Sequence, residues 1–402
     1  MIKNIQHTVI DLDKTRYAGH PRQGGIFDFG NGELAVLYNR APCAYKQWPD
    51  VRHDVGGYHQ RSQVILARTY DGGATWDRAN DVVVFDRTTP DDAQLQYLEQ
   101  TKRDPQTPRD TIDLNSPDTA IHFGFTWISD CDPPRLVGFA LRSADRGHTW
   151  ESVPTLLNPR TDSASAHYGI PLIAMPDGTH LGAMSHSAGN MYPPLDGTPT
   201  DTTEYPHHIA LYGTDDHGLT WEPLSMICHD PTGLGFPAYA ALLLLPSGRL
   251  QCYTLNIGGQ RDTIQVCHSD DGGYSWSDTR PIVGWGRSPW VNVPQQHRMS
   301  GRKAFGKFLR SPWPLRLADG RIVVIFGRRK PPYGIGLIVS ENDGDTWSDQ
   351  QIIRADSAGP DLGYNVAVET APGTIFTAYY YTDDDGNGFG GTRYIAGSHI
   401  EI

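Results

Sequence analysis

The chain has 402 residues, enough for two or three ordinary domains or for one body built from repeats. Its 46 acidic residues outnumber its 34 lysines and arginines, and the formal charge of −12 argues against nucleic acid as a partner. No apolar run is long enough to cross a bilayer, and Met1–Asp13 lacks the apolar core of a signal peptide. We therefore expect a cytoplasmic protein without a membrane partner, or a secreted one if a leader has been removed.

The cysteines and histidines do not predict a metal or cofactor site. Five cysteines are an odd number and include no Cys-x-x-Cys pair, which favours free buried thiols over a disulfide framework or a zinc site. No spacing of histidine, cysteine and carboxylate residues specifies a metal. We expect neither a metal nor a cofactor.

An octet of the pattern Ser/Thr-x-Asp-x-Gly-x-Thr/Ser-Trp recurs along the chain. Its five copies are residues 69–76, 143–150, 214–221, 269–276 and 340–347, the last with Asn in place of Asp. An Asp or Asn side chain can hydrogen-bond its own backbone, and Gly supplies a positive φ without steric cost. One copy would indicate only a hairpin turn, whereas five indicate a repeat architecture.

The segments between octets share one order of elements: a strand, a tight turn, a second strand, a variable loop and a third strand. The expected strands are residues 25–29, 33–39, 63–70, 120–127, 136–143, 169–175, 180–185, 208–214, 238–245, 249–255, 262–269, 314–317, 321–327, 335–340, 364–369, 374–381 and 393–400. The sixth unit lacks an octet, and Ile5–Leu12 is placed to supply its missing strand. This order predicts an all-β, six-bladed propeller of four-stranded antiparallel blades. We expect one domain, 1–402, rather than a sandwich or a solenoid.

One face of such a propeller should carry the function. The inner hairpins and the octet turns fall on one face, while the starts of the first strands and the long loops fall on the other. Polar residues expected there include His20, Arg22, His53, Asp54, Tyr58, His167, His208, Tyr239, Arg261, Arg310, Arg328, Arg329, Asp361, Tyr364 and Tyr380. Arginines bind carboxylates bidentately, a carboxylic acid can protonate a leaving oxygen, and a tyrosine can attack a sugar carbon.

The octets resemble the Asp-box repeat of bacterial neuraminidases, and the whole chain resembles the sialidase superfamily. That family has Tyr-Arg-Ile-Pro before its first inner strand, and this chain has His-Pro-Arg-Gln-Gly-Gly-Ile at 20–26. The next strand ends in Tyr-Asn-Arg at 38–40. The resemblance implies that Arg22 is the first arginine of a carboxylate-binding triad, with Arg40 as a further substrate-binding residue.

The resemblance also implies roles for residues in later loops. The acid/base aspartate of the family lies before the first octet, where Asp54 is the preferred candidate and Asp50 the alternative. The third arginine falls in the fifth blade, at Arg328 or Arg329, and Arg310 enters the same blade. The nucleophilic tyrosine begins the last blade, where Gly-Tyr-Asn-Val at 363–366 supplies Tyr364.

Two positions depart from the family pattern. The glutamate that activates the tyrosine should begin the fourth blade, but residues 235–239 hold no carboxylate. The second arginine should stand at Asn256, and Arg261 lies five residues further on. Another base would then have to serve Tyr364. The candidates are His167, His207 and His208.

These features together predict an exo-glycosidase that removes a terminal, acidic sugar from a glycan or oligosaccharide. Two alternatives stay open. One is a polysaccharide lyase or atypical glycosidase that works through histidine and tyrosine, and the other is a propeller that only binds glycans. The sequence leaves the sugar, the linkage, the stereochemical course and the oligomeric state open.

Overall fold

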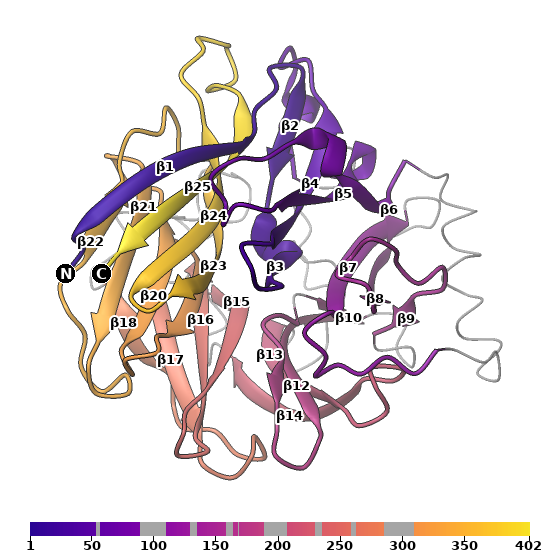
Figure 1. The fold of residues 1–402 in the computed structure, drawn as a ribbon, viewed down its shortest axis with the longest axis vertical. Helices are drawn as coiled ribbons and strands as arrows, with labels where there is room; N and C mark the ends of the chain where they lie inside the picture. The colour runs from indigo at the N-terminus through magenta and orange to yellow at the C-terminus, as the bar shows by residue number, and fades with distance from the viewer. Residues whose placement is uncertain are drawn as a thin grey trace.

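The computed structural model describes residues 1–53, 57–88, 110–128, 135–157, 164–167, 169–188, 207–229, 235–258, 263–284 and 309–402. Within these ranges the secondary structure consists of β-strands and four short 3-10 helices. The helices are η1 (Pro21–Gln23), η2 (Trp48–Asp50), η3 (Tyr58–Arg61) and η4 (Arg78–Asn80). The strands form sheets that radiate from a common centre, as Figure 1 shows.

The sheets follow one another in chain order. The first contains β2 (Arg16–Gly19), β3 (Gly25–Asp28), β4 (Leu34–Pro42), β5 (Gln63–Thr69) and β6 (Val82–Asp86). The second contains β7 (Ala120–Ile128), β8 (Arg135–Ser143) and β9 (Thr155–Leu156). The third contains β10 (Ala164–His167), β11 (Ile173–Ala174), β12 (His180–Ala188), β13 (His207–Thr214) and β14 (Glu222–His229).

The remaining three sheets complete the circle. The fourth contains β15 (Gly235–Leu244), β16 (Leu250–Gly258), β17 (Thr263–Ser269) and β18 (Arg280–Val283). The fifth contains β19 (Leu309–Arg316), β20 (Ile322–Arg328), β21 (Gly334–Ser340) and β22 (Gln351–Arg354). The last contains β23 (Gly363–Ala371), β24 (Thr374–Thr382), β25 (Arg393–Glu401) and β1 (Asn4–Asp11).

The prediction of a propeller with four-stranded antiparallel blades is confirmed. Five of the sheets contain an antiparallel path of four strands. The second sheet has three strands within the described ranges, so the expected count of four is met in five blades rather than six. In the first and third sheets the innermost strand is divided, since β2 and β3 both pair with β4, and β10 and β11 both pair with β12.

The N-terminal strand closes the ring, as the sequence predicts. β1 is the outermost strand of the last sheet and pairs antiparallel with β25, from Asn4 opposite Glu401 to Asp11 opposite Ile395. The two ends of the chain therefore lie side by side in one sheet, where Figure 1 marks both termini.

The five octets form the same turn. In each, the Asp or Asn side chain accepts a hydrogen bond of 2.9 Å from the backbone N–H four residues on. The fifth residue of each octet is a glycine with φ between 79° and 98°. Gly73 also packs against the last sheet, because a Cβ there would lie 2.8 Å from the Phe376 ring. The repeated sequence is thus a repeated local structure.

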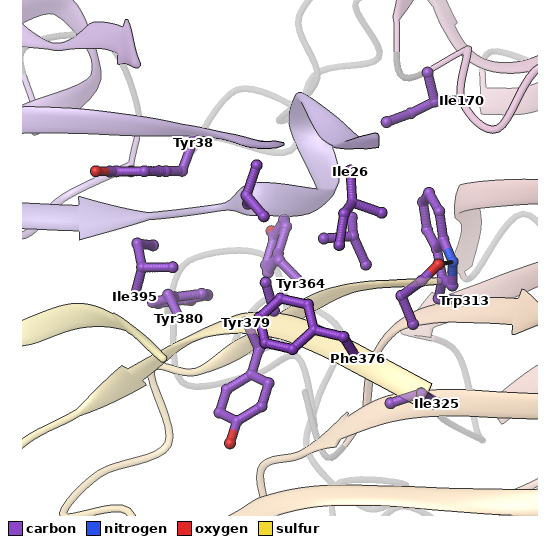
Figure 2. Close-up of a cluster of buried hydrophobic side chains, with 14 of the residues drawn as sticks. Ile26, Tyr38, Ile170, Trp313, Ile325, Tyr364, Phe376, Tyr379, Tyr380 and Ile395 are labelled. Carbon is purple, nitrogen blue, oxygen red and sulfur yellow. Dashed lines mark hydrogen bonds between the residues drawn. The ribbon is translucent and has the colours of Figure 1, made fainter. Parts of the chain in front are cut away.

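The largest apolar cluster among the described residues joins side chains of several sheets. Its members include Tyr38 of the first sheet, Trp313 of the fifth, and Tyr364, Phe376 and Tyr380 of the last. Figure 2 shows these side chains converging from separate strands. The inner ends of the sheets that carry functional candidates are therefore anchored in one continuous core.

Two further sequence expectations concern cysteines and membranes. Cys43, Cys228, Cys252 and Cys267 are buried and form no disulfide, which agrees with free thiols, and Cys131 lies outside the described residues. Among the described helices, none has the length and apolar character needed to cross a bilayer.

Candidate functional site

The innermost strands start with a backbone distortion that aims side chains toward the centre. Pairing shifts register at Tyr239 in β15, at Ser311 in β19 and at Tyr364 in β23. These residues have φ values of 57°, 23° and 56°. Bulges re-aim side chains, and left-handed backbone at residues other than glycine costs about 1–3 kcal/mol, so such strain gathers at functional sites.

In the first sheet His20 has the corresponding conformation. It lies between β2 and η1 with φ 63° and ψ 50°. Its ring stands perpendicular to that of Tyr364, with centroids 4.4 Å apart. Residues near the two ends of the chain therefore meet at the centre of the molecule.

A group of polar and aromatic side chains surrounds this contact, and we call it the central cluster. Its members are Tyr17, His20, His53, Tyr58, Tyr239, Arg310, Arg329, Asp361, Tyr364, Tyr380 and Arg393. The hydroxyl groups of Tyr239 and Tyr364 lie 2.5 Å apart. Tyr364 is 5% exposed, so its hydroxyl is held in place by packing as well as by this contact.

Asp361 is the carboxylate of the central cluster, and it has several partners. It accepts hydrogen bonds from Tyr380 Oη at 2.5 Å, Tyr17 Oη at 3.1 Å and Arg393 Nε at 3.0 Å. His53 Nε2 and Arg329 Nη2 lie 3.4 Å and 3.6 Å from its oxygens. Burial alone would raise the pKa of Asp361, but His53 and the two arginines hold that pKa well below its usual range. The carboxylate is therefore ionised and engaged.

The two arginines of the fifth sheet differ in their partners. Arg329 donates to the Leu362 carbonyl at 2.8 Å and 3.0 Å and to Tyr380 Oη at 2.5 Å. Arg310 is 2% exposed, and its Nε has no hydrogen-bond partner among the described residues. Its Nη1 donates a long hydrogen bond, 3.4 Å, to the Leu309 carbonyl. No carboxylate forms an ion pair with Arg310 in the described part of the chain.

Electrostatics keep the His20 imidazole neutral. Burial lowers the pKa of His20 well below its usual range, and the neighbouring His53 and the guanidinium groups of Arg329 and Arg310 lower it further. The Tyr58 hydroxyl contacts His20 Nδ1, and the Tyr58 ring stacks on that of Tyr17 at 4.0 Å. The imidazole is thus fixed in orientation and uncharged at neutral pH.

Several of the residues predicted for the site belong to this cluster and others lie apart. Tyr364, Arg310 and Arg329 belong to it, whereas Arg328 is half-buried and donates to the Pro332 carbonyl at 3.1 Å. Arg40 lies apart from the cluster, and its Nη1 pairs with Asp81 at 2.5 Å and with Asp11 at 3.4 Å.

Arg22 is fully buried. It donates to the Ala240 carbonyl and lies over the Trp313 ring, 5.0 Å from its centroid. Its described contacts therefore link the first sheet to the fourth and fifth.

The remaining candidates lie at the third sheet or outside the described residues. His208 is half-buried on β13, opposite His186 and His229. His167 ends β10 opposite Ser185, and its side chain is outside the described part, as is that of His207. Asp54 and Arg261 also lie outside the described residues.

Tyr17 and Arg393, which both contact Asp361, were not among the residues predicted for the site. Tyr17 is in β2 and Arg393 begins β25. In the described ranges no group of three or more histidine, cysteine or acidic residues is arranged to hold a metal.

Comparisons with known proteins concern the fold. No protein-family model and no curated protein matches the sequence. A Dyadobacter fermentans protein of unknown function is similar in structure, with a TM-score of 0.70, 19% identity and 99% of each chain covered.

Two enzymes share the fold at lower similarity. The α-L-arabinofuranosidase Arb93A of Fusarium graminearum has a TM-score of 0.59 at 13% identity, covering 98% of this chain and 97% of the enzyme. The NanB sialidase of Streptococcus pneumoniae has a TM-score of 0.55 at 12% identity, covering 98% and 70%. Both are glycoside hydrolases, and this chain has the β-propeller fold that they share.

Proposed function

We propose that this protein is a glycosidase that removes a terminal, acidic sugar from a glycan or oligosaccharide. The observation that carries the proposal is the buried guanidinium of Arg310, which has no carboxylate partner among the described residues. Burying a charge without a partner is unfavourable by several kcal/mol, so an anionic ligand would complete the site. A sugar carboxylate suits a guanidinium in both charge and shape.

The same arginine lies beside the strand that carries Tyr364. A Cβ at Gly363 would lie 3.0 Å from Arg310 Cβ, and Gly363 directly precedes Tyr364. A sugar held by Arg310 and Arg329 would therefore reach the Tyr364 hydroxyl. The resemblance to sialidases and the similarity in fold to known glycosidases support this proposal. We also propose that the octets are Asp-box repeats and that the second sheet is the sixth blade.

Tyr364 would act as the nucleophile and Asp54 as the acid/base. As its proton passes to a neighbouring base, the tyrosine oxygen bonds to the sugar carbon, the glycosidic bond breaks and Asp54 protonates the leaving oxygen. Water, deprotonated by Asp54, then takes the sugar from Tyr364, and the base returns its proton to the tyrosine oxygen.

A substrate screen tests the proposal. The purified protein would be assayed on terminal-sugar nitrophenyl and methylumbelliferyl glycosides, sialosides included. Tyr364→Phe should lower kcat at least about 100-fold, since the nucleophilic hydroxyl is lost. Tyr379→Phe is the matched control, because Tyr379 is buried in the same sheet but its hydroxyl contacts Ser398 at 2.6 Å. Full activity of Tyr364→Phe would remove the proposed role.

A lyase acting on uronate polysaccharides is the second candidate. The observation that favours it is that an imidazole, His20, and a phenol, Tyr239, contact Tyr364. Such groups can remove a proton beside a carboxylate that arginines neutralise. Ultraviolet absorbance of an unsaturated uronate product would identify this activity, and saturable binding without turnover would indicate a glycan-binding protein.

A further inference from the structure

A chain of hydrogen bonds crosses the sheet in which the N-terminal strand closes the ring, and we call it the closure chain. His7 Nδ1 on β1 lies 2.8 Å from the hydroxyl oxygen of Ser398, the residue opposite it on β25. That hydroxyl lies 2.6 Å from the Tyr379 hydroxyl of β24. Tyr379 in turn hydrogen-bonds the guanidinium of Arg354 on β22. The closure chain therefore joins the N-terminal strand to the last and fifth sheets.

The direction of each hydrogen bond in the closure chain follows from its Arg354 end. A guanidinium has donors and no acceptor, so Arg354 donates to the Tyr379 oxygen. Burial raises the pKa of Tyr379, which keeps its proton, and this O–H donates to Ser398. The Ser398 O–H is then left to donate to His7 Nδ1. The closure chain thus requires a neutral His7 whose Nδ1 carries no proton.

Protonation of His7 conflicts with this direction. His7 is exposed and can take a proton from solvent, whereas Ser398 and Tyr379 are fully buried. The new N–H at Nδ1 would face a hydroxyl that already donates toward it. If Ser398 turned to accept from His7, one buried hydroxyl proton would have no acceptor, because Arg354 closes the far end of the chain. A buried donor without a partner is unfavourable.

The charged neighbours of His7 come from the fifth sheet. Partial burial of the ring lowers the pKa of His7, Arg354 lowers it further, and Asp356 opposes both. Arg354 also donates to Asp356 from Nε at 2.6 Å and from Nη2 at 3.1 Å, and it hydrogen-bonds Tyr394 of β25. The folded ring thus favours neutral His7, whereas a released strand would bind the proton near the ordinary histidine pKa of about 6.5. The closure chain is complete above that pH and weakens below it.

We propose that His7 is an acid-sensitive latch on the closure of the ring. At neutral pH the imidazole accepts the last hydrogen bond of the closure chain and holds β1 to the last sheet. In acid the imidazolium breaks the chain at Ser398, and β1 separates from β25 more often. β1 is followed by β2, which carries Tyr17 of the central cluster, so the latch makes the attachment of this part of the chain depend on pH. This inference is independent of the proposed sugar chemistry.

Backbone hydrogen exchange of residues 4–11 tests the latch. Mass spectrometry would give the protection factor of this strand, which corrects the exchange rate for its intrinsic pH dependence. From about pH 7 to about pH 5 we expect protection in the wild type to fall at least about 5-fold, because a buried hydroxyl loses its acceptor. His7→Gln keeps an uncharged acceptor at both pH values and should remove this fall. An equal fall in His7→Gln would overturn the proposal.

Tyr379→Phe separates the latch from simple repulsion between His7 and Arg354. Without the Tyr379 hydroxyl, Ser398 can turn and accept a hydrogen bond from charged His7. The fall in protection should therefore disappear although His7 and Arg354 both remain. An undiminished fall in Tyr379→Phe would mean that charge repulsion causes it, and would overturn the role of the closure chain.

His399→Gln is the matched control. His399 follows Ser398 on β25 and stands opposite Gln6, so its side chain points to the other face of the sheet, where it packs against Phe376. Its replacement should leave the acid-induced fall in protection intact. Loss of the fall in His399→Gln as well would show that His7 has no special place in it, and would count against the latch.

Discussion

Arg310 and Arg40 each carry a guanidinium into the protein interior, and they differ in what neutralises it. Arg40 lies between two carboxylates, Asp11 and Asp81. Arg310 has none among the described residues. Both residues were predicted to bind substrate, but the structure gives them opposite surroundings.

Replacing each arginine by methionine should change stability in opposite directions. Arg310→Met removes an uncompensated buried charge and should raise the free energy of unfolding by about 1 kcal/mol while weakening substrate binding. Arg40→Met takes from Asp81 its ion-pair partner, while Asp11 keeps Arg78, and should lower it by about 2–3 kcal/mol. Urea unfolding of both variants tests this, and a loss of stability in Arg310→Met would mean that its charge is balanced within the protein.

The sequence predicts the strand ends near which these arginines stand. It does not predict the face of the sheet to which each arginine side chain points. Asn39 and Arg40 are neighbours at the end of β4, and alternation sends Asn39 to Gln23 and Arg40 to the carboxylates. The register of the partner strand decides which of the two faces the centre, and one sequence does not contain that register. The same limit applies to Arg328 and Arg329.

At the scale of elements, the octets were the most predictable part of the structure. Their hydrogen bonds join residues two to four positions apart, so the sequence alone specifies them. The bulges at Tyr239, Ser311 and Tyr364 were not predictable, because a bulge depends on the strand that pairs opposite it.

The first octet offers a test of its contact with the last sheet. Gly72 and Gly73 both have positive φ, but a Cβ on Gly72 would meet nothing within 4 Å, whereas one on Gly73 would press on Phe376. Gly72→Ala should cost about 1 kcal/mol from backbone strain alone. Gly73→Ala should cost a further 1–3 kcal/mol, roughly, from overpacking. Equal losses in thermal or urea unfolding would show that the contact adds nothing.

At the scale of the whole molecule, buried neutral histidines make the fold sensitive to acid. Burial lowers the pKa of His20 and His59 well below 6.5 and that of His122 to about 3. The unfolded chain binds these protons near pH 6.5 and the folded chain does not, so stability is full above that pH and falls below it. Asp361, with its lowered pKa, adds its own loss only below its usual value of 3.8.

The unfolding free energy should therefore decrease between about pH 6.5 and about pH 4, by up to about 1.4 kcal/mol per pH unit for each of these histidines. Urea titrations across this range measure the slope, and His122→Phe should reduce it by one histidine's share. A flat profile would show that these imidazoles take up protons without unfolding.

The pairing of β1 with β25 has a consequence for biosynthesis. Tyr17 and Asp361, which hydrogen-bond in the central cluster, are 344 residues apart in the chain. A ribosome releases the N-terminal strand long before its partner exists, so the first strand must wait, unpaired, until the last has emerged. A prematurely terminated product would keep an open sheet edge and an incomplete central cluster. Ring closure thus makes full-length translation a condition of assembling the central cluster.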